Sequence, residues 1–301
     1  MFRLVQKLAD DGIDVAVTCR VLSVSRSGYY EWRERPLSAR DLADAYLANT
    51  VVDVHKMSRG SYGAPRMHAE MRLELGIRVG RKRIARLLRL TGRAGIGDNT
   101  HRRRRKKPAP APHEDLVQRR FVADEPNRLW CTDSTEHPTG GGTVYLACVE
   151  DVFSRQIVGW SIANHMRSEL VVDALQMATW RRRPTPGTVV HSDRGSQGGS
   201  NWSSQHLDLG GVDGQASVGS VGDALDNALA ESEIGLFKTE LIRRQGPWKG
   251  LDDVELGTLE WVDWHNHRRL HSACYDLPPV EYEQIYYGRH PAQHGAGVST
   301  I

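Results

Sequence analysis

The stretch from residue 101 to residue 112 constrains the fold of this chain more than any other feature. A run of six Arg and Lys residues at 102–107 is followed by three prolines that alternate with alanines. Such a segment repels itself and has no apolar face to bury, so it cannot belong to a packed core. We therefore expect a basic, proline-rich linker over residues 101–122 that separates two differently built halves.

The two halves carry opposite charge. Residues 1–110 contain 24 Lys and Arg against 11 Asp and Glu, whereas residues 111–301 contain 16 against 26. A strongly basic half predicts contact with a polyanion such as nucleic acid. The acidic half keeps carboxylates available, and one use for them is to hold divalent metal ions.

The front half has the pattern of helices joined by short turns. Residues 14–35 predict two short helices, with Ser25 as the N-cap of the second. Residues 37–56 predict one amphipathic helix. A helix opened by Pro65 and a strongly basic helix over 81–90 follow, and this pair is typical of a helix-turn-helix whose second helix enters a DNA groove. A plain helical hairpin for 14–35 and a solvated basic surface for 81–90 are the alternatives.

Basic side chains in three places are candidate contacts to DNA phosphates. The basic helix supplies Arg81, Lys82, Arg83, Arg86 and Arg89, the linker supplies Arg102, Arg103, Arg104, Arg105, Lys106 and Lys107, and the back half supplies Arg194 and Lys238. Solvated surface charge is the alternative for each of them, and a flexible tether is the alternative for the linker.

The hydrophobic pattern of the back half is typical of strands as well as helices. The hydrophobic pattern predicts strands at 129–135, 143–149, 156–162 and 188–193, and helices at 168–180 and from 223 to about 243. Strands that first run as hairpins and then alternate with helices indicate a mixed α/β sheet with helices packed on it.

Three acids occupy informative places in that pattern. Asp133 lies on the first strand, Asp193 ends the fourth, and Glu231 lies on the last helix. An acid that ends an apolar strand is costly unless it is paired or bound to a cation. Carboxylates are the hard oxygen ligands that Mg²⁺ prefers, and two such ions about 4 Å apart stabilise both oxygens of an in-line phosphodiester displacement. The pattern therefore points to metal-dependent phosphoryl transfer.

Seven segments together resemble one family of proteins. In the back half they are LWCTD (129–133), FSRQIVGW (153–160), HSDRGSQ (191–197), GDALDNALAES (222–232) and WVDWHNHRRLH (261–271), and in the front half SYGAPRM (61–67) and GRKRIARL (80–87). Along nearly its whole length the chain resembles the OrfB transposases of the IS-three family of bacterial insertion sequences.

The resemblance implies an α/β fold: a ribonuclease-H-like integrase catalytic core, with a mixed five-stranded sheet and helices, preceded by an all-α helix-turn-helix region. It implies a DNA transposase that cuts the ends of an insertion sequence and joins them to new DNA. Asp133, Asp193 and Glu231 would hold the cofactor, Mg²⁺ or Mn²⁺, as two ions. The expected domains are a helical or helix-turn-helix-like region at 1–57, a second helix-turn-helix at 58–100, the linker at 101–122, the catalytic core at 123–287 and a tail at 288–301.

Four further residues are secondary site candidates. Asn227 shares a helix face with Glu231 and would orient water or phosphate, whereas Asp226 lies one step off that face. Asp151 follows the second strand, and a turn residue is its alternative role. His191 lies on the same side of its strand as Asp193, and a structural role is its alternative.

The chain departs from the family pattern in two places. Thirty-seven residues separate Asp193 from Glu231, two more than is usual, and the stretch 198–215 lacks the hydrophobic pattern of the helix expected before the fifth strand. His265 stands where an aromatic residue is common before Asn266. A catalytically decayed copy that acts only as a sequence-specific DNA-binding or regulatory protein is therefore the alternative function. A host nuclease with the same core is a third interpretation, distinguished by cleavage without strand transfer.

The remaining expectations concern partners, location and cysteines. No apolar run approaches the roughly 18 residues of a membrane helix, so we expect a cytoplasmic, nucleoid-associated protein without membrane contact. The expected partner is DNA, both the terminal inverted repeats and the target, bound by a homo-oligomer. The resemblance adds an upstream-frame OrfA protein or a fusion with it. The four cysteines form no C-x-x-C pair, which predicts reduced, buried thiols.

Overall fold

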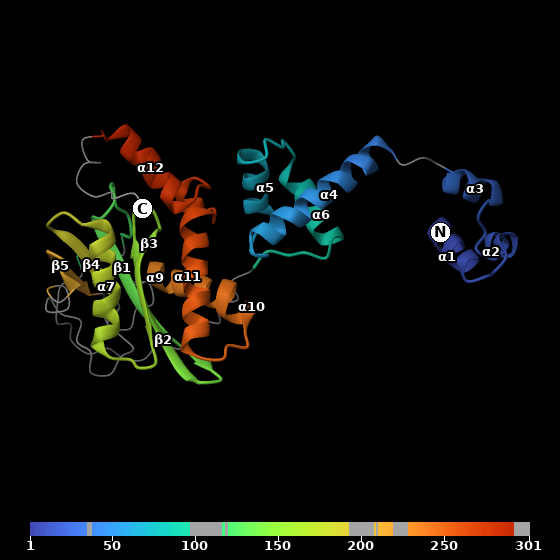
Figure 1. Ribbon diagram of the computed structural model, residues 1–301. Helices are drawn as coiled ribbons and strands as arrows, with labels where there is room; N and C mark the ends of the chain where they lie inside the picture. The colour runs from blue at the N-terminus through green and yellow to red at the C-terminus, as the bar shows by residue number, and fades with distance from the viewer. Residues whose placement is uncertain are drawn as a thin grey trace.

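The computed structural model describes residues 1–34, 38–96, 116–117, 120–192, 208, 210–218 and 228–291. Within these ranges the chain forms two small helical units and one larger α/β unit, arranged in chain order from right to left in Figure 1.

The first helical unit consists of α1 (Phe2–Asp10), α2 (Val15–Val21) and α3 (Arg26–Glu34). Its small core gathers Val5, Cys19 and Tyr29. The hydroxyl of Ser25 accepts a hydrogen bond from the Gly28 backbone N–H at 3.2 Å, which confirms the predicted N-cap of the second helix in 14–35. The sequence pattern did not predict α1, whose Phe2 ring packs against Tyr29 and Trp32.

The second helical unit consists of α4 (Ala39–Met57), α5 (Ala64–Leu73) and α6 (Arg81–Leu90). The predicted apolar stripe of the basic helix is confirmed, because Ile84, Leu87 and Leu88 are all buried. These side chains belong to the same apolar cluster as Val51 and Val54 of α4. The boundary expected at residue 57 therefore falls where α4 ends, inside this packed unit.

The α/β unit is built on five strands, β1 (Leu129–Thr139), β2 (Gly142–Asp151), β3 (Ile157–Ala163), β4 (Thr188–Ser192) and β5 (Gly214–Val218). Their order across the sheet is β3-β2-β1-β4-β5. The first three strands pair antiparallel, whereas β4 runs parallel to β1 and β5 runs parallel to β4. This topology confirms the expected mixed five-stranded sheet.

The two faces of the sheet are covered by different helices. Helix α7 (Ser168–Arg182) covers one face, where Leu170, Ala174, Leu175 and Ala178 pack on Trp130 and on Ala147 and Val149 of β2. The opposite face is covered by α9 (Ala228–Phe237), a π-helical turn η1 (Lys238–Ile242) and α11 (Leu251–His267), whereas the exposed α10 (Arg243–Gln245) follows η1. Val144, Leu146 and Cys148 of β2 point to this second face, in the alternation that a strand dictates.

The chain then closes along the edge of the sheet. The amide side chain of Asn266 accepts a hydrogen bond from the backbone N–H of Ile157 and donates one to its carbonyl, both at 2.9 Å, so α11 satisfies the backbone of edge strand β3. After the short turn η2 (Ser272–Cys274), α12 (Pro279–Arg289) is held to α7 by the buried Arg182–Glu283 ion pair.

Two simpler expectations can be compared with the structure. All four cysteines, Cys19, Cys131, Cys148 and Cys274, are free and buried, as predicted. In the part of the chain that the structure describes, no helix is long and apolar enough to cross a membrane.

Gly159 of β3 lies where the sheet approaches α7 most closely. A Cβ atom at this position would collide with the carbonyl oxygen of Ala174 and with Ala178. We expect Gly159→Ala to lower the free energy of unfolding by about 1–3 kcal/mol, because the sheet or helix must move to relieve the overlap. The matched control is Gly288→Ala in α12, where a Cβ meets nothing within 4 Å.

Urea unfolding followed by tryptophan fluorescence would measure both variants. The control should be unchanged or slightly more stable, because alanine is the better helix former. Equal stability of Gly159→Ala and the wild type would contradict the close approach of β3 and α7.

Candidate active site

Asp133 lies where the parallel partner of its strand ends. The register between β1 and β4 runs from Leu129 opposite Val189 to Thr132 opposite Ser192, and β1 continues to Thr139 beyond it. The Asp133 side chain is half-buried and accepts a hydrogen bond from the backbone N–H of Ser134 at 2.7 Å. By strand alternation it points to the same face as Leu129 and Cys131, away from α7.

Glu231 lies on the helix that covers this face. It is exposed and belongs to the first turn of α9, which packs against β1. The neighbouring Ala230 is buried against Leu129 and Cys131. Asp133 and Glu231 therefore come from two elements that pack together on the same side of the sheet.

Several predicted site residues lie outside the described residues. They are Asp193, Arg194, Asp226, Asn227 and the six linker residues Arg102, Arg103, Arg104, Arg105, Lys106 and Lys107. The described chain reaches Ser192 on β4, immediately before Asp193, and resumes at Ala228 of α9, immediately after Asn227.

His191 links the parallel strands β4 and β5. Its Nδ1 lies 2.9 Å from the hydroxyl oxygen of Ser217 on β5, and the Phe121 ring packs edge-on against it. The imidazole is buried and pairs in register with Cys131, so it faces the same side of the sheet as Asp133. These contacts give His191 a role in holding β4 and β5 together.

The structure places Asp151 apart from Asp133. Asp151 is opposite Trp130 in the β1–β2 register, whereas Asp133 is opposite Cys148, so the two acids face opposite sides of the sheet. The Asp151 carboxylate is fully buried and accepts hydrogen bonds from the backbone N–H groups of Asn127, Phe153 and Ser154. Burial raises its pKa to about 6, and nearby Glu283 adds to the rise. These contacts are those of a turn residue.

Buried polar contacts that the sequence pattern did not identify hold the helix that carries Glu231. Glu233 is buried on α9, and its Oε1 lies 3.2 Å from Nδ1 of His265 on α11. The other ring nitrogen of His265, Nε2, lies 3.1 Å from the Arg155 carbonyl, which can only accept a hydrogen bond. The approach of Glu233 to Nδ1 does not have hydrogen-bond geometry, so among the described residues His265 is hydrogen-bonded through Nε2 alone.

A second buried contact lies further along the same helical run. Arg269, fully buried, donates hydrogen bonds of 2.9–3.1 Å to both carboxylate oxygens of Glu240. The indole N–H of Trp261 lies 3.3 Å from the same carboxylate. Glu240 sits in the π-helical turn η1, where the wider turn buries three consecutive residues, Glu240, Leu241 and Ile242.

The basic helix α6 presents two kinds of arginine. Arg83 and Arg86 both bind the Asp44 carboxylate on α4, and the hydrogen bond from Arg86, followed by that from Arg83, lowers the pKa of Asp44. Arg81, Lys82 and Arg89 are exposed on the same helix. Of the five basic candidates on α6, two therefore also hold the helix against α4.

Lys238 lies beyond the acids along the same face. It opens η1 and is half-buried, and its charge helps burial to lower the pKa of His137 on β1. His137 is four residues past Asp133 on the same strand, a distance of about 13 Å.

Known proteins match this chain along most of its length. The Integrase core domain family matches residues 123–217, a second family of the same description matches 213–279, and the HTH-like domain family matches 41–97. A Mycobacterium tuberculosis protein named after the insertion sequence element IS986/IS6110 is 42% identical, over 89% of this chain and 98% of its own. The transposase for insertion sequence element IS629 of Shigella sonnei is 40% identical, over 95% and 97%. Transposase InsF for insertion sequence IS3A of Escherichia coli is 33% identical, over 89% and 93%.

Among solved structures, similarity is more distant. The catalytic core domain of HTLV-2 integrase in complex with magnesium covers 53% of this chain and 98% of its own, with 14% identity and a TM-score of 0.40. An intasome of simian T-cell lymphotropic virus covers 77% and 74%, with 14% identity and a TM-score of 0.46.

The buried His265 predicts a measurable pH dependence. Burial, followed by the charge of Arg269, lowers the pKa of His265 from 6.5 to about 3. Between these values the unfolded chain binds a proton that the folded chain does not, so this group removes stability as the pH falls below 6.5, by about 1.4 kcal/mol per pH unit. We expect His265→Phe to gain about 2 kcal/mol relative to the wild type between pH 6.5 and pH 5.

Denaturant unfolding of both proteins at several pH values measures this difference. Other buried groups titrate in the same range, so the comparison uses the difference between the two proteins rather than either curve alone. A difference that stays constant from pH 7.5 to pH 5 would show that His265 is not kept neutral by its surroundings.

Proposed function

This chain belongs to the insertion-sequence transposases that carry an integrase core domain, and we propose that Asp133, Asp193 and Glu231 form its catalytic metal site. Its activity is accordingly DNA transposition: the enzyme is a polynucleotidyl transferase that cleaves and joins phosphodiesters. The family relation favours this function over a copy that only binds DNA.

The observation that carries the site is the end of the β1–β4 pairing. Thr132 and Ser192 are register partners, and each immediately precedes one of the two aspartates. Asp193 lies outside the described residues, but consecutive Cα atoms across a trans peptide are about 3.8 Å apart, so it cannot be far from Ser192. A continuing strand would turn its carboxylate to the face of Asp133, which α9 covers.

The available donor atoms fit a divalent metal ion. Asp133 and Glu231 offer hard carboxylate oxygens from two elements that pack together. Such oxygen ligands suit Mg²⁺ or Mn²⁺. The integrase core family implies use of a divalent metal, and we propose two ions. When bound, the ions would stabilise charge on the entering and leaving oxygens of the phosphodiester.

The protein's own contribution is position and charge. Asp133, on a strand, and Glu231, on a helix packed against that strand, would together with Asp193 fix where the scissile phosphodiester lies. Water attacks the phosphodiester at the element end, the bond to the 3′ oxygen breaks, and a free 3′-OH results. That 3′-OH then attacks a second phosphodiester, and one bond forms as another breaks. No covalent intermediate with the protein is needed.

DNA is the partner that the two families imply, and we propose where it binds. The exposed Arg81, Lys82 and Arg89 of α6 would contact the terminal repeat, with Arg83 and Arg86 behind them. The linker residues 102–107, Arg194 and Lys238 would contact phosphates nearer the acids. We further propose a homo-oligomer on DNA in the nucleoid, and an OrfA protein or fusion as a second partner.

Removing single carboxylates tests the metal site. We expect Asp133→Asn and Glu231→Gln each to lower strand transfer of labelled element ends by at least about a thousandfold in Mg²⁺ or Mn²⁺, because each removes a ligand charge. Binding of the ends in the absence of metal should be unchanged. The matched control is Glu136→Gln, an exposed glutamate on the same strand as Asp133. Joining by Glu231→Gln at the wild-type rate would overturn the assignment.

Substitutions on α6 test the DNA interface. We expect Arg81→Ala, Lys82→Ala and Arg89→Ala each to reduce the slope of log affinity against log salt by about 0.9, because each removes one phosphate contact. Fluorescence anisotropy with the element ends at several salt concentrations measures the slopes. Arg128→Ala, at an exposed arginine of the α/β unit, is the control. Unchanged slopes in all three variants would move the interface away from α6.

A further inference from the structure

Tyr62 joins the second helical unit to the α/β unit at one short segment. The Tyr62 hydroxyl donates a hydrogen bond to the Arg268 carbonyl at 3.2 Å and accepts one from the Leu270 backbone N–H at 2.8 Å. It thus holds the backbone on both sides of Arg269. Tyr62 is 2% exposed, and its ring packs in one cluster with Met67 of α5 and with Leu270.

Arg269, which lies between Arg268 and Leu270, binds the helical run that carries Glu231. The Arg269 guanidinium binds both carboxylate oxygens of Glu240 and is completely buried. Arg66, at the start of α5, lies close enough to both partners for their charges to act on it in opposite directions. The helical unit therefore reaches the surroundings of this ion pair through the Tyr62 hydrogen bonds on either side of Arg269 and through the charge of Arg66.

From Glu240 a continuous helical run leads back to Glu231. Helix α9 passes directly into η1, so Glu240 comes nine positions after Glu231, about 13 Å along the helix. Because η1 turns Glu240 into the interior, a shift of its carboxylate is a shift of the helix that carries Glu231. The same run approaches α11 a second time, where Glu233 Oε1 lies 3.2 Å from Nδ1 of His265.

We propose that Tyr62 is a positioning residue, which couples the DNA-binding unit α4–α6 to the catalytic helix through Arg269 and Glu240. The inference rests on the proposed roles of α6 and Glu231. According to this proposal, the unit that recognises the element end also fixes the position of the helix that carries a metal ligand. Tyr62 itself contacts no reacting group.

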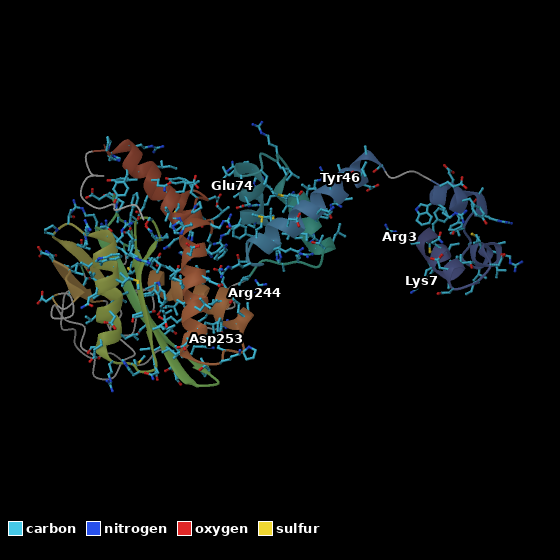
Figure 2. The ribbon with its side chains drawn as sticks, in the orientation of Figure 1. Arg3, Lys7, Tyr46, Glu74, Arg244 and Asp253 are labelled. Carbon is cyan, nitrogen blue, oxygen red and sulfur yellow. The ribbon has the colours of Figure 1, made fainter. Side chains whose placement is uncertain are left out.

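Contacts other than the Tyr62 hydroxyl also attach the helical unit to the α/β unit. Arg59 holds the units together independently, since it donates to the Glu260 carbonyl at 3.1 Å and stacks over the Trp264 ring. Gly60 lies against the Arg244 side chain, which Figure 2 shows on the side of the α/β unit nearest the helical unit. Loss of the hydroxyl alone leaves these contacts and the ring packing in place.

The experiment compares Tyr62→Phe with Tyr46→Phe in the full chain. Both variants remove one phenolic hydroxyl from the same unit, but Tyr46 is exposed on α4, toward the end away from the α/β unit in Figure 2. We expect Tyr62→Phe to lower the rate of strand transfer by about tenfold, with the affinity for element ends within about twofold of wild type. The Mg²⁺ concentration for half-maximal rate should rise. Tyr46→Phe should match the wild type in all three measurements.

A double-mutant cycle tests whether the effect passes through the ion pair. The background is Glu240→Met with Arg269→Met, because a buried ion pair can often be replaced by apolar residues without loss of folding. In that background Tyr62→Phe should change the rate by less than about twofold. A tenfold loss that persists there, or a loss that parallels weaker DNA binding, would overturn the proposal.

Hydrogen exchange separates this proposal from the proposed function. In the free protein, Tyr62→Phe should speed amide exchange in residues 228–242, and Tyr46→Phe should not. If the wild type joins no DNA ends, the proposed function fails, yet the exchange comparison still tests the coupling. Unchanged exchange in 228–242 together with an unchanged joining rate would rule the coupling out.

Discussion

The parallel pairing of β1 with β4 is the constraint on which the rest of the α/β unit depends. Parallel strands need a crossover, and here α7 supplies it, packed so closely on the sheet that β3 has room only for Gly159 beneath it. With one face filled by α7, the opposite face receives α9 over β1 and α11 over β3. Asp133 directly follows the last register pair, Thr132 and Ser192, so this proposed metal ligand lies where the described β1–β4 pairing ends.

The helix that bears Glu231 is fixed by buried charge rather than by apolar packing alone. A buried ion pair such as Glu240–Arg269 adds little net stability over well-packed apolar residues, but removing one partner costs about 3–5 kcal/mol because the other charge is left unpaired. Such a pair therefore permits fewer alternative packings than an apolar contact would. For a helix that must present a carboxylate to a metal site, restriction to one position is the useful property.

The same pair lies beneath the contact between the helical unit and the α/β unit. Tyr62 binds the backbone on either side of Arg269, and the apolar interior of α4–α6 is continuous with the cluster around Trp261 and Leu270. DNA recognition and catalysis would then depend on the same buried contacts within a single chain. This arrangement gives a physical reason for polar groups in the most buried part of the interface.

The sequence by itself determined the residue types of the chemistry and the elements with strong periodicity. Spacing and hydrophobic pattern placed Asp133 on a strand and Glu231 on a helix, predicted the buried stripe of α6, and predicted four of the five strands, because these signals are local. The segment Gly214–Val218 has no strong strand pattern of its own, and pairing with β4 makes it a strand. The roles of Asp193 and Asn227 remain predictions from the sequence, since both lie outside the described residues.

Only the tertiary structure decided which charged residues are structural. Asp44 binds Arg83 and Arg86 from about forty positions away, Asp151 faces the side of the sheet opposite Asp133, and Glu240 meets Arg269 inside the protein. Tyr62 and Arg269 lie in two of the segments that carry the family resemblance, but the sequence assigned neither residue a role. Their partners lie far away in the chain, 206 and 208 residues for Tyr62, and no local pattern encodes a contact over that distance. Residue type and periodicity can be read from a short stretch of sequence, whereas the contacts of a side chain depend on which distant residues the fold brings together.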